Sequence, residues 1–285
     1  SDGDPGPLAA VSWPESKWAF GEPDVILEVP EQHVPATGVL DYRYINVAID
    51  LDGQDRWLRG SQYLPGDRTV LHHTVNNLRD PGQVGRRGGP NQANITAYIP
   101  GVTPKMAPPN TGGLLKDGSV LRLNMHYTTN GKESIDRGEI GLWFYPEDEV
   151  PTERMSGRCA CIFTADWTNI PPYDPNFVQT QTITIAEDAH IHSMLPHMHF
   201  RGKSMRFVAE YPDGTSEELI NIANYNYNWQ LTYTYEEPKF VPAGTKITAI
   251  GAFDNSEQNP ANPDPSRSVP WGQQSWDEMF FGSVR

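Results

Sequence analysis

The sequence has little cysteine, few positively charged side chains and no long hydrophobic run. Two cysteines among 285 residues exclude a framework of several disulfides. Lysine and arginine together number 22 against 36 acidic residues, which gives a formal net charge of -14. Nucleic acids and acidic membrane surfaces bind through a basic face, so we expect neither as a partner. Because no apolar segment approaches the roughly 20 residues of a membrane-spanning helix, we also expect no membrane insertion.

The two cysteines, Cys159 and Cys161, are separated by a single residue. Side chains at this spacing on a strand lie along one face rather than meeting sulfur to sulfur, which makes a bridge awkward. Two buried thiols, a strained bridge and a further metal site therefore all stay open as alternatives.

Glycine and proline are abundant, with 25 and 26 residues, and they separate short segments of strand-like alternation. The clearest alternation spans 43–51, and similar patterns occur at 120–128, 227–235 and 245–253. No segment has the apolar stripe of a helix. Many short strands between turn signals predict an all-β fold of the sandwich type.

A proline-flanked acidic segment at 146–151 interrupts this pattern and marks a domain boundary. We therefore predict two antiparallel, jelly-roll-like β-sandwich domains in tandem, at 16–152 and 153–285, with a cleft between them. Three further segments are too long for simple hairpins and are predicted as loops, namely 79–94, 100–118 and 255–275.

Histidines mark the first candidate site. In the strand predicted at 119–128, His126 lies on the polar face, opposite the apolar one, which weakens its interpretation as a core residue. His72 and His73 are adjacent, so on a regular strand they would point to opposite faces. Both could reach one ion only at a bulge or a strand end. Taken alone, this pair is equally well explained by one buried and one exposed histidine.

His197 and His199 are two residues apart, so on a strand they share a face and can present two nitrogens to one ion. A turn follows them, which places the pair near a strand end. Two histidines alone do not distinguish copper from zinc. Met279 favours copper, because a thioether prefers Cu(I), although most methionines simply fill gaps in a core.

In order and approximate spacing, these motifs resemble the copper type II, ascorbate-dependent monooxygenases over most of the chain, from about 41 to 282. The resemblance implies a first copper held by His72, His73 and His126. It implies a second, O2-activating copper held by the catalytic residues His197, His199 and Met279. It also assigns supporting or cleft-lining positions to His190 and Asn124.

The family hydroxylates a C–H bond with O2 and takes single electrons from ascorbate through two copper ions. The resemblance thus implies a small-molecule substrate, O2 and a reductant as partners, with an electron-donor domain, fused or separate, as a further one. It also implies a secreted or periplasmic location. In the peptide-hydroxylating members, an Arg, an Asn and a Tyr hold a substrate carboxylate, and the matching positions here carry Leu195, Phe281 and Ser283. We therefore expect an apolar or aromatic substrate without that carboxylate.

Two other functions stay open at this point. A non-catalytic copper-binding or electron-transfer protein would keep the same ligands without a substrate site. A carbohydrate- or partner-binding β-sandwich would use the 8 tryptophans and 12 tyrosines, with the metal motifs incidental.

Overall fold

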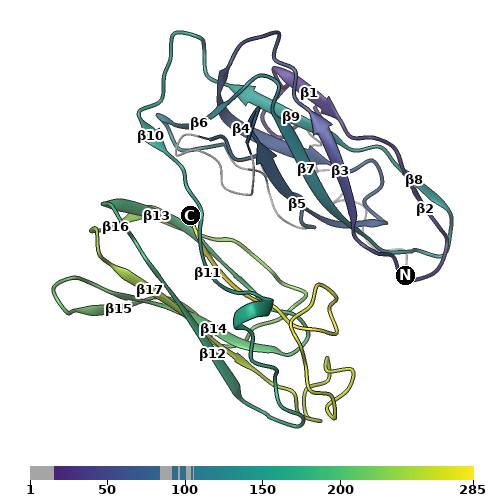
Figure 1. Ribbon diagram of the computed structural model, residues 1–285, viewed down its shortest axis with the longest axis vertical. Coiled ribbons are helices and arrows are strands. Elements are labelled where there is room, and N and C mark those ends of the chain that lie inside the picture. Colours follow the sequence, from purple (N-terminus) through teal and green to yellow (C-terminus); the bar gives the residue numbers. More distant parts are fainter. Residues whose placement is uncertain (1–15, 84–91, 96, 101–103, 105) are drawn as a thin grey trace, which may run out of the picture. The chain divides into compact units, whose positions relative to one another are not determined.

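The computed structural model describes residues 16–83, 92–95, 97–100, 104 and 106–285. Within this part the chain is built from β-strands, with a single 3-10 turn at Thr164–Asp166 (Figure 1). The all-β prediction is therefore confirmed. The chain divides into two compact units, of which the first ends at Met155 and the second is Ser156–Arg285. No helix in the described part is long and apolar enough to cross a membrane.

The first unit has a five-stranded sheet in the order β1-β9-β4-β6-β10, a three-stranded sheet in the order β3-β7-β5 and the pair β2-β8. Neighbouring strands are antiparallel except β6 and β10, which are parallel. The strands are β1 (Val25–Glu28), β2 (Gln32–Val34), β3 (Arg43–Ala48), β4 (Arg56–Leu64), β5 (Leu71–Arg79), β6 (Thr111–Leu115), β7 (Val120–Tyr127), β8 (Ser134–Asp136), β9 (Glu139–Phe144) and β10 (Glu153–Arg154).

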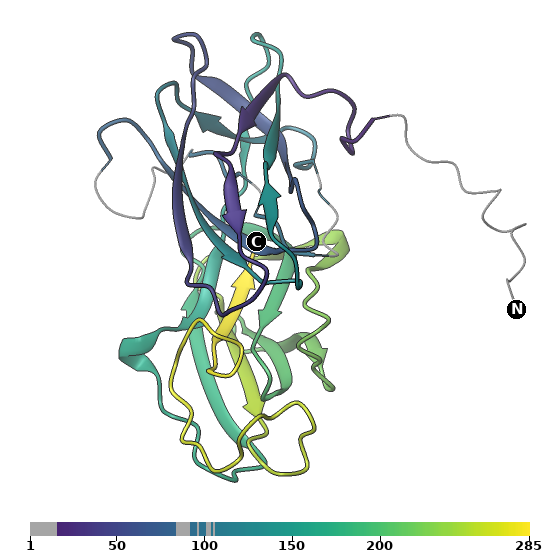
Figure 2. The same cartoon turned by 90° about the vertical axis from the view of Figure 1, so that its right-hand side faces the viewer.

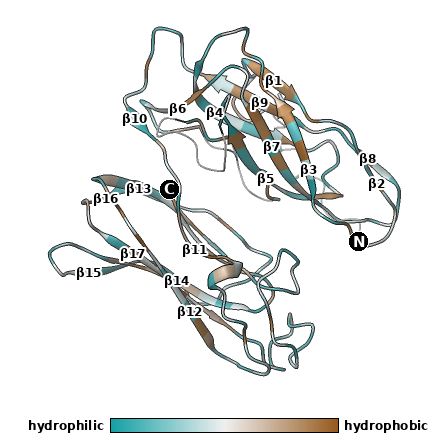
Figure 3. Ribbon diagram, viewed as in Figure 1, coloured by the Kyte–Doolittle hydropathy of each residue, from teal (hydrophilic) through white to brown (hydrophobic). Residues whose placement is uncertain are grey.

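Alternation along β7 explains how the first unit buries its core. Leu121, Leu123 and Met125 are fully buried and share one apolar cluster with Ile140 and Leu142 of β9, in the other sheet. The two sheets therefore form a sandwich. In Figure 3 the strands β1, β5, β7 and β9 carry many of the hydrophobic residues of this unit. The opposite face of β7 is left for polar side chains, among them the predicted metal ligand of this strand.

The second unit is a sandwich of two antiparallel four-stranded sheets, in the orders β11-β18-β13-β16 and β12-β17-β14-β15. Phe207, Phe253 and Phe280 are fully buried in the cluster that both sheets share. The strands are β11 (Arg158–Ile162), β12 (Phe177–Thr184), β13 (Ala189–His197), β14 (Gly202–Glu210), β15 (Ser216–Ile222), β16 (Tyr233–Val241), β17 (Lys246–Phe253) and β18 (Phe280–Val284).

The predicted loop at 255–275 has no strand, and Figures 1 and 2 show the segment between β17 and β18 as a long loop at one end of the second unit. The loop prediction at 100–118 is wrong in part, because β6 lies inside it. Residues 101–103 and 105 of that segment, and 84–91 of the one at 79–94, lie outside the described residues.

The strand predicted at 227–235 is also wrong in its first half, since β16 begins only at Tyr233. Asn226 causes the difference. Its side chain accepts a hydrogen bond from the Asn228 amide at 2.9 Å, and its carbonyl oxygen accepts one from Trp229 at 2.8 Å, which closes a turn. The alternating aromatic residues imitate a strand, but Trp229 is 67% exposed.

Candidate metal centres

A bulge brings the three histidines of the first unit to one place. β5 and β7 are antiparallel, and His73 lies directly opposite His126. Their register shifts between Leu71 and His73, so His72 is the extra residue of a β-bulge. This is the irregularity that the adjacent pair required. Without it, His72 and His73 would point to opposite faces of the sheet.

The imidazole rings of this cluster form a close triangle. The ring centroids of His72 and His73 are 5.2 Å apart, those of His72 and His126 5.5 Å, and those of His73 and His126 5.2 Å. Tyr42, just before β3, covers the triangle, with its ring 4.6 Å from His126 and its hydroxyl 3.4 Å from Nε2 of His73. The first-unit histidines therefore gather although 53 residues separate His73 from His126.

Two nitrogens of the cluster face each other, and burial favours the neutral form of His72 and His126. Nδ1 of His72 lies 3.0 Å from Nδ1 of His73, and Nδ1 of His126 is buried without a hydrogen-bond partner among the described residues. Burial lowers the pKa of His72, and burial together with His72 lowers the pKa of His126 to about 4. Neutral imidazole is the form that binds a metal.

These residues fit a metal in donor type and proximity, but not yet in orientation. For metal–nitrogen bonds of about 2.0 Å, two nitrogen ligands at right or tetrahedral angles lie roughly 2.8–3.4 Å apart, which includes the separation of the two adjacent histidines. Nevertheless, no group of three or more His, Cys, Asp or Glu side chains in the described ranges is arranged to hold a metal ion as it stands. A metal would require rotation of the histidine side chains. Nδ1 of His126, buried without a partner among the described residues, is costly to leave unsatisfied, and a bound metal would satisfy it.

Asn124 precedes His126 by two residues and shares the outer face of β7 with it. Its Oδ1 is buried and has no hydrogen-bond partner among the described residues. Its role as a supporting residue stays a prediction, since no contact between the two side chains is seen.

The second cluster lies where β13 ends. His197 is the last residue of this strand, His199 lies in the turn that follows, and β14 begins at Gly202. The two ring centroids are 5.2 Å apart, with ring planes at 86°. As predicted, the pair lies at a strand end followed by a turn.

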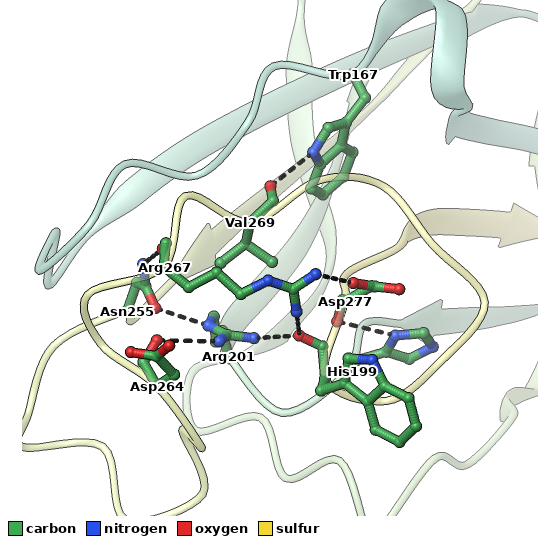
Figure 4. Close-up of polar contacts among 9 residues, drawn as sticks. Trp167, His199, Arg201, Asn255, Asp264, Arg267, Val269 and Asp277 are labelled. Atoms are coloured by element: carbon green, nitrogen blue, oxygen red, sulfur yellow. Dashed lines mark hydrogen bonds and ion pairs between the residues drawn. The ribbon is translucent and has the colours of Figure 1, made fainter. Parts of the chain in front are cut away.

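Both of these histidines have a defined tautomer. Nδ1 of His197 donates a hydrogen bond to Oε1 of Gln230, whose amide group donates in turn to the Tyr227 carbonyl. Nδ1 of His199 donates to the carbonyl oxygen of Asp277 at 3.2 Å (Figure 4). An imidazole that donates from Nδ1 carries its lone pair on Nε2, and partners of this kind orient metal-binding histidines. Burial also lowers the pKa of His197.

The pairing of β13 with β18 places the backbone of Met279 next to that of His197 and His199. In the β13-β18 register, His197 is opposite Phe281, so continuing the register places His199 opposite Met279. The amide groups of His199 and Met279 donate to the same oxygen, Oε2 of Glu278, at 2.8 and 3.3 Å. Met279 itself is only 9% exposed. The structure thus brings the backbone of the predicted sulfur ligand to the two histidines.

The side chains beside His197 are largely apolar. Leu195 pairs with Ser283 and His197 with Phe281 across β13 and β18, so all four side chains share one face of the sheet. The Phe281 ring stacks on His197 with centroids 5.6 Å apart and lies 5.3 Å from Phe163, which is 51% exposed.

His190 is not brought to the second cluster. It lies at the other end of β13, seven residues from His197, with its ring 5.5 Å from that of Phe240. The cysteines of β11 are joined as a disulfide in the structure, which is one of the alternatives that their spacing left open.

Residues that sequence reasoning missed complete the second centre. Gln230 and Glu278 are 33 and 79 residues away in sequence from the histidines that they bind. Arg201 is fully buried and donates to Asn255 at 2.7 Å and to the Trp276 carbonyl at 2.9 Å, which anchors the long loop after β17 (Figure 4). A charged residue two positions after the H-x-H was the local signal for Arg201, and its burial could not be predicted from this position.

No protein-family model and no curated protein matches this chain.

Proposed function

We propose that this protein is a two-copper monooxygenase that hydroxylates a C–H bond of a small, apolar or aromatic molecule, using O2 and an external one-electron reductant such as ascorbate. The observation that carries the proposal is the gathering of two separate sets of imidazoles. One set contains three rings within 5.5 Å of one another, and the other contains two rings whose lone pairs are both left on Nε2.

The donor types support copper over other metals. Five imidazoles suit copper, zinc, iron and nickel alike, but a thioether next to two imidazoles favours Cu(I). When bound, copper would supply one-electron redox chemistry at both centres and O2 chemistry at the second. Met279 marks the second centre as the one for O2, because it is the centre whose donor set stabilises the reduced ion.

The protein's own residues would hold and orient the ligands. Gln230 and the Asp277 carbonyl fix the tautomers of His197 and His199, so that Nε2 of each carries the lone pair. Tyr42 covers the first cluster and limits water around its histidines. Burial lowers the pKa of His72, His126 and His197, which favours the neutral imidazole that binds a metal over the protonated form.

The face beside His197 supports the substrate class. Phe281, Phe163 and Leu195 offer aromatic and aliphatic surface next to the proposed O2 site, and the aligned positions have no positive charge for a carboxylate. Binding a carboxylate in such surroundings would cost several kcal/mol of lost hydration, of the order of 2–7 for even a neutral polar group.

Copper titration with product analysis tests the proposal. We expect two copper ions per chain, and reductant-dependent O2 uptake that matches hydroxylated product mole for mole with a panel of alkylbenzenes. A glycine-extended peptide should be a poor substrate. Two bound coppers without any hydroxylated product would instead indicate a copper-binding or electron-transfer protein, and no bound copper would favour a carbohydrate- or partner-binding sandwich.

A further inference from the structure

We propose that Glu278 is a positioning residue of the second centre, whose carboxylate replaces the backbone ladder between His199 and Met279 and fixes the spacing of these two ligands. This inference rests on the proposed function, since it assigns the residue a role toward the same centre.

The backbone ladder between β13 and β18 stops just before the ligands. It runs from Met194 opposite Val284 to His197 opposite Phe281, where β13 ends, and β18 itself begins at Phe280, so His199 and Met279 both lie outside the strands. In a continued ladder, the amides of His199 and Met279 would bond to backbone carbonyl groups across the pair. Instead both amides donate to Oε2 of Glu278, at 2.8 and 3.3 Å. One side-chain oxygen therefore joins the two ligand-bearing residues.

The other carboxylate oxygen holds the turn that carries His199. Oε1 of Glu278 accepts a hydrogen bond from the Arg201 amide at 2.6 Å, and the His199 carbonyl accepts one from the Gly202 amide at 3.0 Å. The direction of the His199 side chain follows from the shape of this turn. Both oxygens of Glu278 thus act on the same ligand, one through its own amide and one through the turn.

Only a carboxylate can accept hydrogen bonds on both of its oxygens from the amides of His199, Arg201 and Met279. Glu278 is 0% exposed, and a buried acid is unfavourable unless donors and opposite charge compensate it. Burial raises the pKa of Glu278 to about 8, while the three amides and Arg201, itself 0% exposed and held by Asn255, act in the opposite direction and favour the carboxylate. A glutamine at this position would turn an NH2 group toward at least one of the amides. A buried acid is unfavourable, and its presence here is therefore explained by its role in positioning His199 and Met279.

The test measures Cu(I) binding with a competing chelator, together with the copper–sulfur signal in X-ray absorption, for Glu278→Gln, Glu278→Ala and the matched control Glu187→Gln. The control removes the same charge from an exposed position of the same unit. We expect both Glu278 variants to bind the first copper normally and to lose about 10–100-fold in affinity at the second, with a weaker sulfur signal. Glu187→Gln should behave as the wild type.

Unchanged second-site affinity and an unchanged sulfur signal in folded Glu278→Ala would overturn the inference. If both variants fail to fold, amide hydrogen exchange of the metal-free wild-type protein decides instead. The amides of His199, Arg201 and Met279 should then exchange slowly, and exchange as fast as in exposed loops would contradict the role of Glu278. Should the wild type bind no second copper, the proposed function fails, while slow exchange at these amides would still support the tie between the two backbones.

Discussion

At the scale of single residues, the sulfur of Met279 would distinguish the two proposed centres. Isoleucine has a similar volume and is apolar, so Met279→Ile keeps the packing around β18 while it removes the thioether. We expect turnover to fall by at least about tenfold, the smallest loss usual when a metal centre is disturbed. Copper at His72, His73 and His126 should remain bound.

The control for this variant is the leucine substitution of a methionine that lies in the core of the same unit and is not a proposed ligand. Met205 on β14 is fully buried, so Met205→Leu should leave both turnover and copper content close to those of the wild type. Near-full activity of Met279→Ile would show that the sulfur assignment is wrong.

His126 gives a prediction on pH. Its pKa is about 4 in the folded protein against 6.5 for an unperturbed histidine, because burial and His72 disfavour the charged ring. Folding therefore favours the neutral form. The resulting stability is fully present above about pH 6.5 and is lost as the pH falls from 6.5 towards 4.

Urea unfolding of the metal-free protein between pH 7.5 and 4 measures this effect. The free energy of unfolding of the wild type should fall more steeply over this range than that of His126→Asn, which cannot titrate. Parallel curves would mean that His126 is no more buried in solution than in an unfolded chain.

At the scale of the elements, the sandwich of the second unit depends on glycines where its sheets meet. A Cβ added at Gly282 on β18 would lie 2.6 Å from Cβ of Ala249 and 3.0 Å from the Phe207 ring. Overpacking of this kind costs about 1–3 kcal/mol. This cost exceeds the stabilisation of about 0.4–1 kcal/mol that a Gly-to-Ala substitution brings by restricting the unfolded chain.

Gly282→Ala should therefore lower the free energy of unfolding of the second unit, as measured by urea titration. Gly157 is the matched control in the same unit, because an added Cβ there meets nothing within 4 Å. Gly157→Ala should be neutral or slightly stabilising. Equal effects of the two substitutions would show that Gly282 is not closely packed in solution.

The elements also show what the sequence could and could not predict. Apolar and polar residues alternate strictly at 120–128, because one face of the strand is buried and side chains on a strand repeat with a period of two. This pattern correctly predicted both the strand β7 and the face on which His126 lies. The adjacent histidines required a bulge, and β5 has one. By contrast, the aromatic alternation at 227–232 indicated a strand where Asn226 forms a turn, since a local side-chain hydrogen bond leaves no trace in hydrophobic periodicity.

The supporting residues of the second centre could not be predicted for a different reason. Gln230 and Glu278 act through contacts with segments 33 and 79 residues away, and both residue types are usually exposed. Only the register between β13 and β18 places Glu278 beside His199. A pattern within a single strand carries no information on such a pairing.

At the scale of the whole molecule, each unit contains its own core. Leu123 belongs to the cluster of the first unit and Phe207 to that of the second, and both side chains are fully buried. A unit with its own core is expected to unfold as a unit. Leu123→Ala and Phe207→Ala should each cost about 2–5 kcal/mol, but in different thermal transitions.

Differential scanning calorimetry of the metal-free variants tests this expectation. The transition that Leu123→Ala lowers should be unaffected by Phe207→Ala, and the reverse should also hold. A single transition that both variants lower equally would show that the two cores do not unfold separately.

Each unit also contains every predicted ligand of its own centre, so copper should stabilise the units independently. The first unit contains His72, His73 and His126, and the second contains His197, His199 and Met279. A ligand that binds only the folded state stabilises it by about 2.7 kcal/mol at one hundred times its Kd. In the wild type, Cu(I) should therefore raise both calorimetric transitions. In His126→Ala it should raise only the transition that Phe207→Ala lowers, and a rise of both transitions in that variant would contradict the assignment of His126 to the first centre.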